Sequence, residues 1–205
     1  MEKLDKILPI VEKPARYIGM ELNSVKKDLN NINVKFAFAF PDVYEVGMSH
    51  LGLHIIYNLL NKEDDIACER VFAPWPDMEN GMRREGIPLF TLENKVPINE
   101  FDFVGFTLQY EMSYTNIINM LDLGGIPIIS EDRTEEDPFI IAGGPCAYNP
   151  EPLWEIMDFF VMGESEEAFF EITEKFKKWK KESKSRDEFL REIMVLVKIS
   201  IKYSL

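Results

Sequence analysis

The sequence predicts an α/β domain in which helices cover both faces of a parallel sheet of five strands. From Asn33 onward, short apolar runs alternate with longer segments of helical periodicity, as in consecutive βαβ units. Each run is apolar on both faces, which is typical of strands buried inside a parallel sheet. The 205 residues, 46% of them hydrophobic, suffice for one domain with its own core.

The expected strands and helices follow one another along the chain. The five strands are Val34 to Phe40, Ala67 to Phe72, Phe103 to Leu108, Phe139 to Ala142 and Phe159 to Met162. Ser49 is the expected N-cap of a helix to about Asn61, and its apolar residues at helical spacing are Leu51, Ile55, Ile56, Leu59 and Leu60. Further helices are expected over Met78 to Glu85, over Tyr114 to Leu123 and from about Glu164.

The two ends of the chain are expected to lie outside this domain. Residues 1–32 predict an N-terminal arm, residues 33–182 the α/β domain, and residues 183–205 a C-terminal tail. In the tail, Val195, Val197, Ile199, Ile201 and Tyr203 recur with a period of two, as in a strand. Such a strand would extend a sheet, pair with a second copy in a homodimer, or be disordered.

Composition excludes several classes of function. The 36 acidic and 23 basic residues give a net charge of -13, which argues against a nucleic-acid-binding surface. No apolar run approaches the roughly 20 residues that span a bilayer, so we expect no membrane segment. Only Cys68 and Cys146 occur, and no signal peptide is recognisable, which favours a cytoplasmic location.

The candidate binding residues follow the strands, because ligands of open parallel sheets bind beyond the carboxyl ends of the strands. Neither G-x-G-x-x-G nor a P-loop motif occurs, so the phosphate-binding loops of common nucleotide sites are missing. A phospho-receiver needs an acidic residue near the end of the third strand, where this chain has Thr107. Hydroxyl, amide and glycine at these positions indicate a neutral, bulky ligand that is approached by the backbone. The candidates are Asp42, Tyr44, Gly47, Ser49, Thr107, Gln109, Gly143 and Gly144.

Several motifs resemble a known family. They are Pro14-Ala15-Arg16-Tyr17-Ile18-Gly19, Ser49-His50-Leu51-Gly52-Leu53, Gly143-Gly144-Pro145 with Asn149-Pro150-Glu151-Pro152, and Asp158-Phe159-Phe160-Val161-Met162-Gly163-Glu164. Together they resemble the N-terminal cobalamin-binding-like domain of an uncharacterised bacterial family of radical S-adenosylmethionine (SAM) proteins. This resemblance implies a three-layer flavodoxin-like fold with strand order 2-1-3-4-5.

The resemblance also implies where a cobalamin would bind. Cobalamin domains that ligate cobalt through histidine carry D-x-H-x-x-G after the first strand. Here Asp42 and Gly47 match that motif, but Tyr44 replaces the histidine. The family's hydroxyl residue corresponds to Thr107, and its glycine pair to Gly143 and Gly144. A corrinoid bound here is therefore expected to lack a histidine ligand from the protein, because a phenol is a poor substitute for imidazole.

The chemistry of the radical reaction is expected to lie elsewhere. Radical SAM proteins hold a four-iron cluster with C-x-x-x-C-x-x-C, which Cys68 and Cys146 cannot supply. The resemblance therefore assigns SAM and the cluster to a separate catalytic core. Residues 183–205 are expected to be a tail truncated from that core. We expect no catalytic residue in this chain.

Other interpretations stay open at this stage. Asp42 and Tyr44 are equally consistent with ligand contact and with a structural turn. His50 and His54 are four positions apart, but they are expected to be partly exposed or to cap a loop, so no metal site is expected. The leading hypothesis is an accessory domain that is non-catalytic alone, docks on a radical SAM core and has lost its corrinoid. The alternative is a stand-alone module for small-metabolite binding or self-assembly, with an enzyme third.

Overall fold

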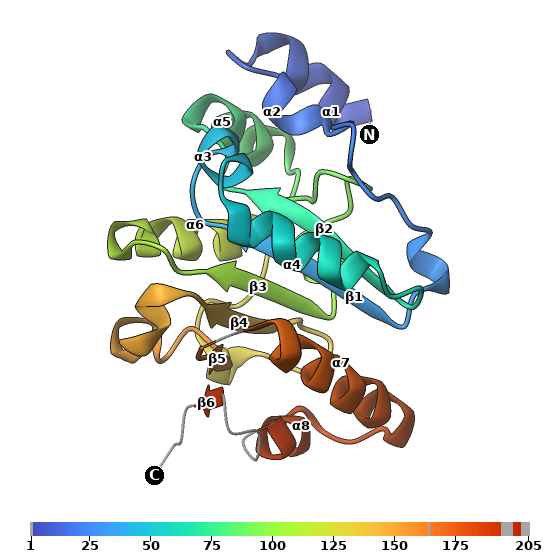
Figure 1. Cartoon of the computed structure of the whole chain (residues 1–205). Helices are drawn as coiled ribbons and strands as arrows, with labels where there is room; N and C mark the ends of the chain where they lie inside the picture. Colours follow the sequence, from blue (N-terminus) through green and yellow to red (C-terminus); the bar gives the residue numbers. More distant parts are fainter. Residues whose placement is uncertain (1, 164, 194–198, 202–205) are drawn as a thin grey trace.

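The computed structural model describes residues 2–163, 165–193 and 199–201 and is built around one sheet (Figure 1). The strand order is β2-β1-β3-β4-β5-β6, and the first five strands are parallel. Their bounds are β1 Val34–Phe40, β2 Ile66–Phe72, β3 Phe103–Thr107, β4 Phe139–Gly143 and β5 Phe159–Val161. The predicted five-stranded parallel sheet and its order 2-1-3-4-5 are confirmed, and every strand lies within one residue of its predicted bounds.

A sixth strand extends the sheet. β6 (Ile199–Ile201) pairs antiparallel with β5, so the described part of the predicted tail strand adds to the sheet of its own chain. The remainder of that predicted strand, residues 194–198 and 202–203, lies outside the described residues. Pairing of the tail with a second copy stays a prediction.

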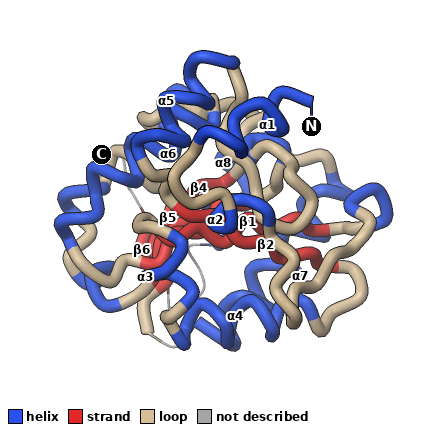
Figure 2. The backbone as a smooth tube through the Cα atoms, turned by 90° about the horizontal axis from the view of Figure 1, so that it is seen from above, coloured by secondary structure: helices blue, strands red, loops and turns tan. Residues whose placement is uncertain are grey.

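Helices form a layer on each side of the sheet (Figures 1 and 2). One layer contains α4 (Leu51–Asn61), α7 (Ser165–Glu182) and α8 (Arg186–Ile193), which share a core with the large side chains of the strands. The other contains α1 (Glu2–Ile7), α2 (Ala15–Ile18), α5 (Pro76–Glu85) and α6 (Tyr114–Gly124). Strand alternation explains the division: in β1, Phe36, Phe38 and Phe40 face α4, whereas Ala37 and Ala39 face α5 and α6.

Both ends of the described chain contribute to these cores. Leu4, Ile7 and Tyr17 of the N-terminal segment are buried beside α5. At the other end, Phe189 and Ile193 of α8 are fully buried against the strands. Residues before and after the predicted domain of 33–182 therefore pack onto it. None of the described helices is long and apolar enough to span a membrane.

Two local predictions are wrong around the start of α4. His50, not Ser49, caps α4, because the His50 Nδ1 atom accepts a hydrogen bond from the Leu53 N–H at 3.2 Å. Ser49 instead follows an unpredicted short helix, α3 (Tyr44–Met48), and donates its hydroxyl to the Val46 carbonyl. The predicted apolar face of this helix is also wrong in part, because Leu51 and Ile55 are exposed. The buried face of α4 consists of Leu53, Ile56, Tyr57 and Leu60.

Candidate functional site

A crevice lies at the carboxyl ends of the central strands, between the sheet and the layer of α4 and α7. Its volume is about 150 Å³. Gly105, Thr107, Gln109, Gly143 and Gly144 form its side toward the sheet. The opposite side is formed by α4, through His50, Gly52 and Ile56, and by the start of α7, through Gly163 and Phe169. The remaining lining residues are Phe38, Phe106, Ile141, Ala142 and Val161.

Glycines make room for the crevice where the strands end. Gly105 has no side chain because the Phe36 ring occupies that space: a Cβ atom there would lie 2.5 Å from the ring. Gly143 lies on the same face of the sheet, and a Cβ atom would approach nothing closer than 3.4 Å. The crevice therefore has an apolar floor, and at Gly143 a Cβ atom would be accommodated at ordinary contact distance from Val161.

The loops after β3 and β4 are tied together at the rim. The Leu108 N–H donates to the Gly143 carbonyl at 2.7 Å, and the Cys146 N–H donates to the Leu108 carbonyl at 3.1 Å. The Gln109 side-chain amide donates to the Thr107 hydroxyl at 2.7 Å. These bonds fix the positions of a hydroxyl and an amide at the mouth of the crevice.

Gly144 is essential to this loop geometry. Its φ of +103° and ψ of -178° lie in a region that only glycine adopts readily, and an added Cβ would be 2.9 Å from the Leu108 carbonyl oxygen. Gly144→Ala is therefore expected to lower the free energy of unfolding by about 3 kcal/mol, measured by urea denaturation.

The matched control is Gly163→Ala on the other side of the crevice. Gly163 also has a positive φ, of +86°, but no heavy atom lies within 4 Å of an added Cβ. Gly163→Ala should lower the free energy of unfolding by less than Gly144→Ala, because it adds only backbone strain. Equal losses would show that the contact with Leu108 is unimportant.

His50 adds a hydrogen-bond donor that the sequence analysis did not include among the binding residues. Its Nδ1 atom accepts the Leu53 N–H, so the neutral ring carries its proton on Nε2. The ring packs beside Phe40 at a centroid distance of 5.4 Å. The polar side chains that line the crevice are therefore His50, Thr107 and Gln109, and the others are apolar. This arrangement suits a flat, neutral ring with a hydrogen-bond acceptor.

The other four predicted site residues do not line the crevice. Asp42 closes the turn after β1, where its carboxylate accepts the Val43 N–H at 2.7 Å and its carbonyl accepts the Ala73 N–H at 3.0 Å. Gly47 packs closely against the Phe72 ring, and Ser49 ends α3. The structure thus brings Thr107, Gln109, Gly143 and Gly144 together in the crevice. The other four predicted residues lie on the side of β1 and β2.

Tyr44 is held by the N-terminal segment. Its hydroxyl donates to Glu21 Oε1 at 2.8 Å, and its ring contacts Phe72 edge to face at 5.5 Å. Burial, together with the adjacent Glu21 carboxylate, raises the pKa of Tyr44 to about 12. At neutral pH Tyr44 is therefore a neutral phenol, and its hydroxyl hydrogen is already used in the hydrogen bond to Glu21.

Glu21 belongs to a buried ionic network that the sequence analysis missed. Arg70, 3% exposed, donates to Glu21 Oε2 at 2.8 Å and to Glu93 Oε1 at 2.7 Å, and Glu93 is fully buried. The Arg70 guanidinium also lies 4.7 Å from the Tyr57 ring centroid. A usable signal was present: Glu69 and Arg70 interrupt an apolar strand, and a buried charge requires a partner.

Both histidines also make structural hydrogen bonds. The His54 Nε2 atom lies 2.7 Å from the Met48 carbonyl oxygen, and His50 caps α4. Within the part of the chain that the structure describes, no three His, Cys, Asp or Glu residues are grouped as metal ligands.

Comparison with known proteins places this fold in a family. Residues 52–202 match the family described as radical SAM proteins, N-terminal. An uncharacterized protein of Methanocaldococcus jannaschii is 29% identical over 133 residues, which are 63% of this chain and 24% of that protein. The chain thus matches about a quarter of the length of this relative. No solved structure matches significantly. The chain belongs to the family of N-terminal domains of radical SAM proteins.

Proposed function

We propose that the chain is a non-catalytic accessory domain of a radical SAM protein and that the crevice is its binding site. The observation that carries this proposal is one crevice lined by His50, Thr107, Gln109, Gly143 and Gly144. The crevice lies in a chain that belongs to the family of N-terminal domains of radical SAM proteins. Binding sites in open parallel sheets form at this edge.

The thiols of the chain do not suit radical initiation. Cys68 is fully buried in β2, and Cys146 lies in the loop after β4. With two cysteines in the whole sequence, C-x-x-x-C-x-x-C cannot be formed. Cluster and SAM chemistry would therefore reside in a catalytic core, and this domain would act by binding beside it, in the cytoplasm.

A cobalamin ligated by the protein does not fit the residues present. The phenol that replaces the histidine is bonded to Glu21, and its pKa of about 12 disfavours the phenolate that would bind a metal. We assign no step to cobalt for this reason. The crevice is a different matter, since a space of 150 Å³ holds a benzene-sized ring. Its occupant would be one neutral ring of a metabolite or cofactor.

Hydroxocobalamin and gel filtration test the cofactor part of this proposal. The wild-type protein is expected to elute without the red colour of the corrinoid, because Tyr44, which stands in place of the ligating histidine, is bonded to Glu21. Tyr44→Phe should behave identically, since its hydroxyl serves Glu21. Stoichiometric co-elution with the wild type that Tyr44→Phe abolishes would make Tyr44 a cobalt ligand and contradict the proposal.

A further inference from the structure

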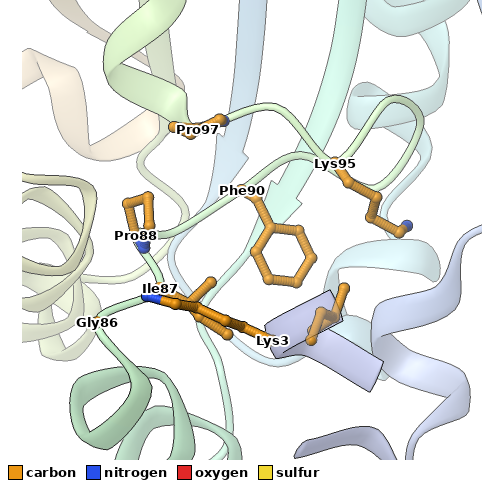
Figure 3. Close-up of a pocket in the computed structure, with 8 residues that line it drawn as sticks. Lys3, Gly86, Ile87, Pro88, Phe90, Lys95 and Pro97 are labelled. Carbon is orange, nitrogen blue, oxygen red and sulfur yellow. The ribbon is translucent and has the colours of Figure 1, made fainter. Parts of the chain in front are cut away.

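A larger cavity lies away from the crevice and shares no residue with it (Figure 3). It opens between α1 and the segment from Gly86 to Pro97, and its volume is about 530 Å³. This is within the range of roughly 300–1,000 Å³ typical of small-molecule sites. The lining residues that matter here are Lys3, Leu4, Ile87, Pro88, Phe90 and Lys95.

The wall of this cavity is fixed by main-chain hydrogen bonds. The Leu89 N–H donates to the Leu123 carbonyl at 2.9 Å, and the Ile98 N–H donates to the Leu89 carbonyl at 2.9 Å. Phe90 is bridged to Pro97 in antiparallel fashion. The Phe90 ring, only 8% exposed, stands in the middle of the space (Figure 3). A ligand would therefore meet a preformed apolar surface.

Two ammonium groups adjoin this apolar surface. Lys3 Nζ donates to the Glu85 carbonyl at 2.9 Å, and Lys95 Nζ donates to the Leu92 carbonyl at 2.5 Å. Lys95 Nζ is also 6.0 Å from the Phe90 ring centroid. Among the described residues, no carboxylate lies within 4 Å of either ammonium, whereas Lys177, Lys180 and Lys184 all have one. In a chain of net charge -13, two such cations at one apolar cavity are notable.

The conformation of Lys95 supports a fixed position for its charge. Its φ is +58°, a left-handed conformation that is uncommon for lysine, and its side chain is partly buried. Burial lowers the pKa of Lys95, and the carboxylates of Glu93, Glu21 and Glu69, none of which contacts its ammonium group directly, only partly oppose this shift. An anionic ligand would supply that direct contact.

We propose that this cavity binds a monocarboxylate with an apolar body, such as a medium-chain alkyl acid. The alkyl chain would lie against Phe90, Ile87 and Pro88, and the carboxylate would pair with the Lys95 ammonium group beside Phe90. A dianion such as a phosphate monoester fits less well, because carbonyl oxygens accompany both ammonium groups and no arginine lines the cavity.

Calorimetric titration with octanoate and with octan-1-ol tests this site in the unmodified protein. The two probes share a chain, so their difference reports recognition of the charge. Octanoate is expected to bind about tenfold more tightly than octan-1-ol, as for a charge-assisted hydrogen bond. Hexanoate should bind more weakly than octanoate, by up to about fourfold for each methylene removed.

Charge-removing variants assign the site. Lys95→Gln should weaken octanoate binding by about fivefold to tenfold and leave octan-1-ol binding unchanged. Lys3→Gln should weaken octanoate binding by less, because the Lys3 ammonium lies at the Glu85 carbonyl. Lys6→Gln is the matched control, because Lys6 is an exposed lysine of the same helix α1 that does not line the cavity. Equal affinities for octanoate and octan-1-ol, no binding of either at millimolar concentration, or an equal loss in Lys6→Gln would overturn the proposal.

Discussion

Asp158→Ala is expected to lower the free energy of unfolding by about 3–5 kcal/mol, because it removes the carboxylate from a buried ionic triad. Asp158 Oδ2 accepts from Arg133 at 3.1 Å and from Arg186 at 2.6 Å, and neither arginine side chain is more than 7% exposed. The same oxygen accepts the Ile140 N–H at 2.6 Å. The variant would leave two buried guanidinium groups without a carboxylate. Urea denaturation of both proteins measures the difference.

The triad also links distant parts of the chain. Arg186 begins α8, Arg133 lies before β4, and Asp158 immediately precedes β5. The control is Asp122→Ala, which removes another carboxylate paired with an arginine, but one that is 52% exposed. Its expected loss is below about 1 kcal/mol. Losses of similar size in the two variants would show that the triad contributes no more than a surface pair.

Arg70→Leu should produce a loss of similar size, about 3–5 kcal/mol, because it leaves Glu93 buried without its cation. Glu93 retains the main-chain Arg70 N–H donor at 2.8 Å, which cannot neutralise the carboxylate. The double variant Arg70→Leu with Glu93→Leu should be more stable than Arg70→Leu alone, since both buried charges are then absent. Denaturation of the four proteins gives this double-mutant cycle.

The pH dependence of the Arg70→Leu loss provides an independent measurement. Burial already raises the pKa of Glu93, and removing Arg70 should raise it further. A carboxyl whose folded-state pKa exceeds its unfolded value is most favourable below the unfolded pKa, and that stability is lost as pH rises through the folded-state pKa. The loss should therefore be smaller near pH 5 than near pH 8. Exposed Arg84→Leu, whose side chain is 59% exposed, should show neither the loss nor the pH dependence.

The sheet was predictable because its strands are consistent at every level. Val34–Phe40 is apolar on both faces, lies between polar segments, and forms β1 with the predicted bounds. Helix ends marked by glycine were equally clear: Gly86 and Gly125 adopt left-handed conformations after α5 and α6. In each case a local signal and the tertiary environment favour the same structure.

Pairing between distant residues was not predictable from local patterns. α3 consists of only five residues, and its position depends on the close contact of Gly47 with Phe72 of β2. Similarly, Arg70 and Glu93 are 23 positions apart, and only folding brings them together. The arm was predicted as a separate segment because its few apolar residues, such as Ile7, show no sign of the α5 surface that they contact.

The candidate site likewise contains residues that strand order places and residues whose positions depend on distant segments. Thr107 and Gly143 end neighbouring strands of the sheet and Gly144 follows directly, so strand order alone brings them together. Tyr44 follows β1 at the same edge, but Glu21, from a segment with no predicted position, holds its hydroxyl. His50 and Gly163 were missed as lining residues because they belong to the helical side of the crevice.

The crevice is tested most directly by titrating the ¹⁵N-labelled protein with pyridine, a flat ring with one acceptor, and following the backbone amide signals. We predict chemical-shift changes confined to residues around Gly105, Thr107, Gly143 and Gly163. Benzene, which lacks the acceptor, should bind more weakly than pyridine. The changes should be lost in Gly143→Val, because the valine side chain would fill the space. Shifts centred on Tyr44, no shifts at all, or shifts that persist in a folded Gly143→Val protein would contradict the assignment of the crevice as the binding site.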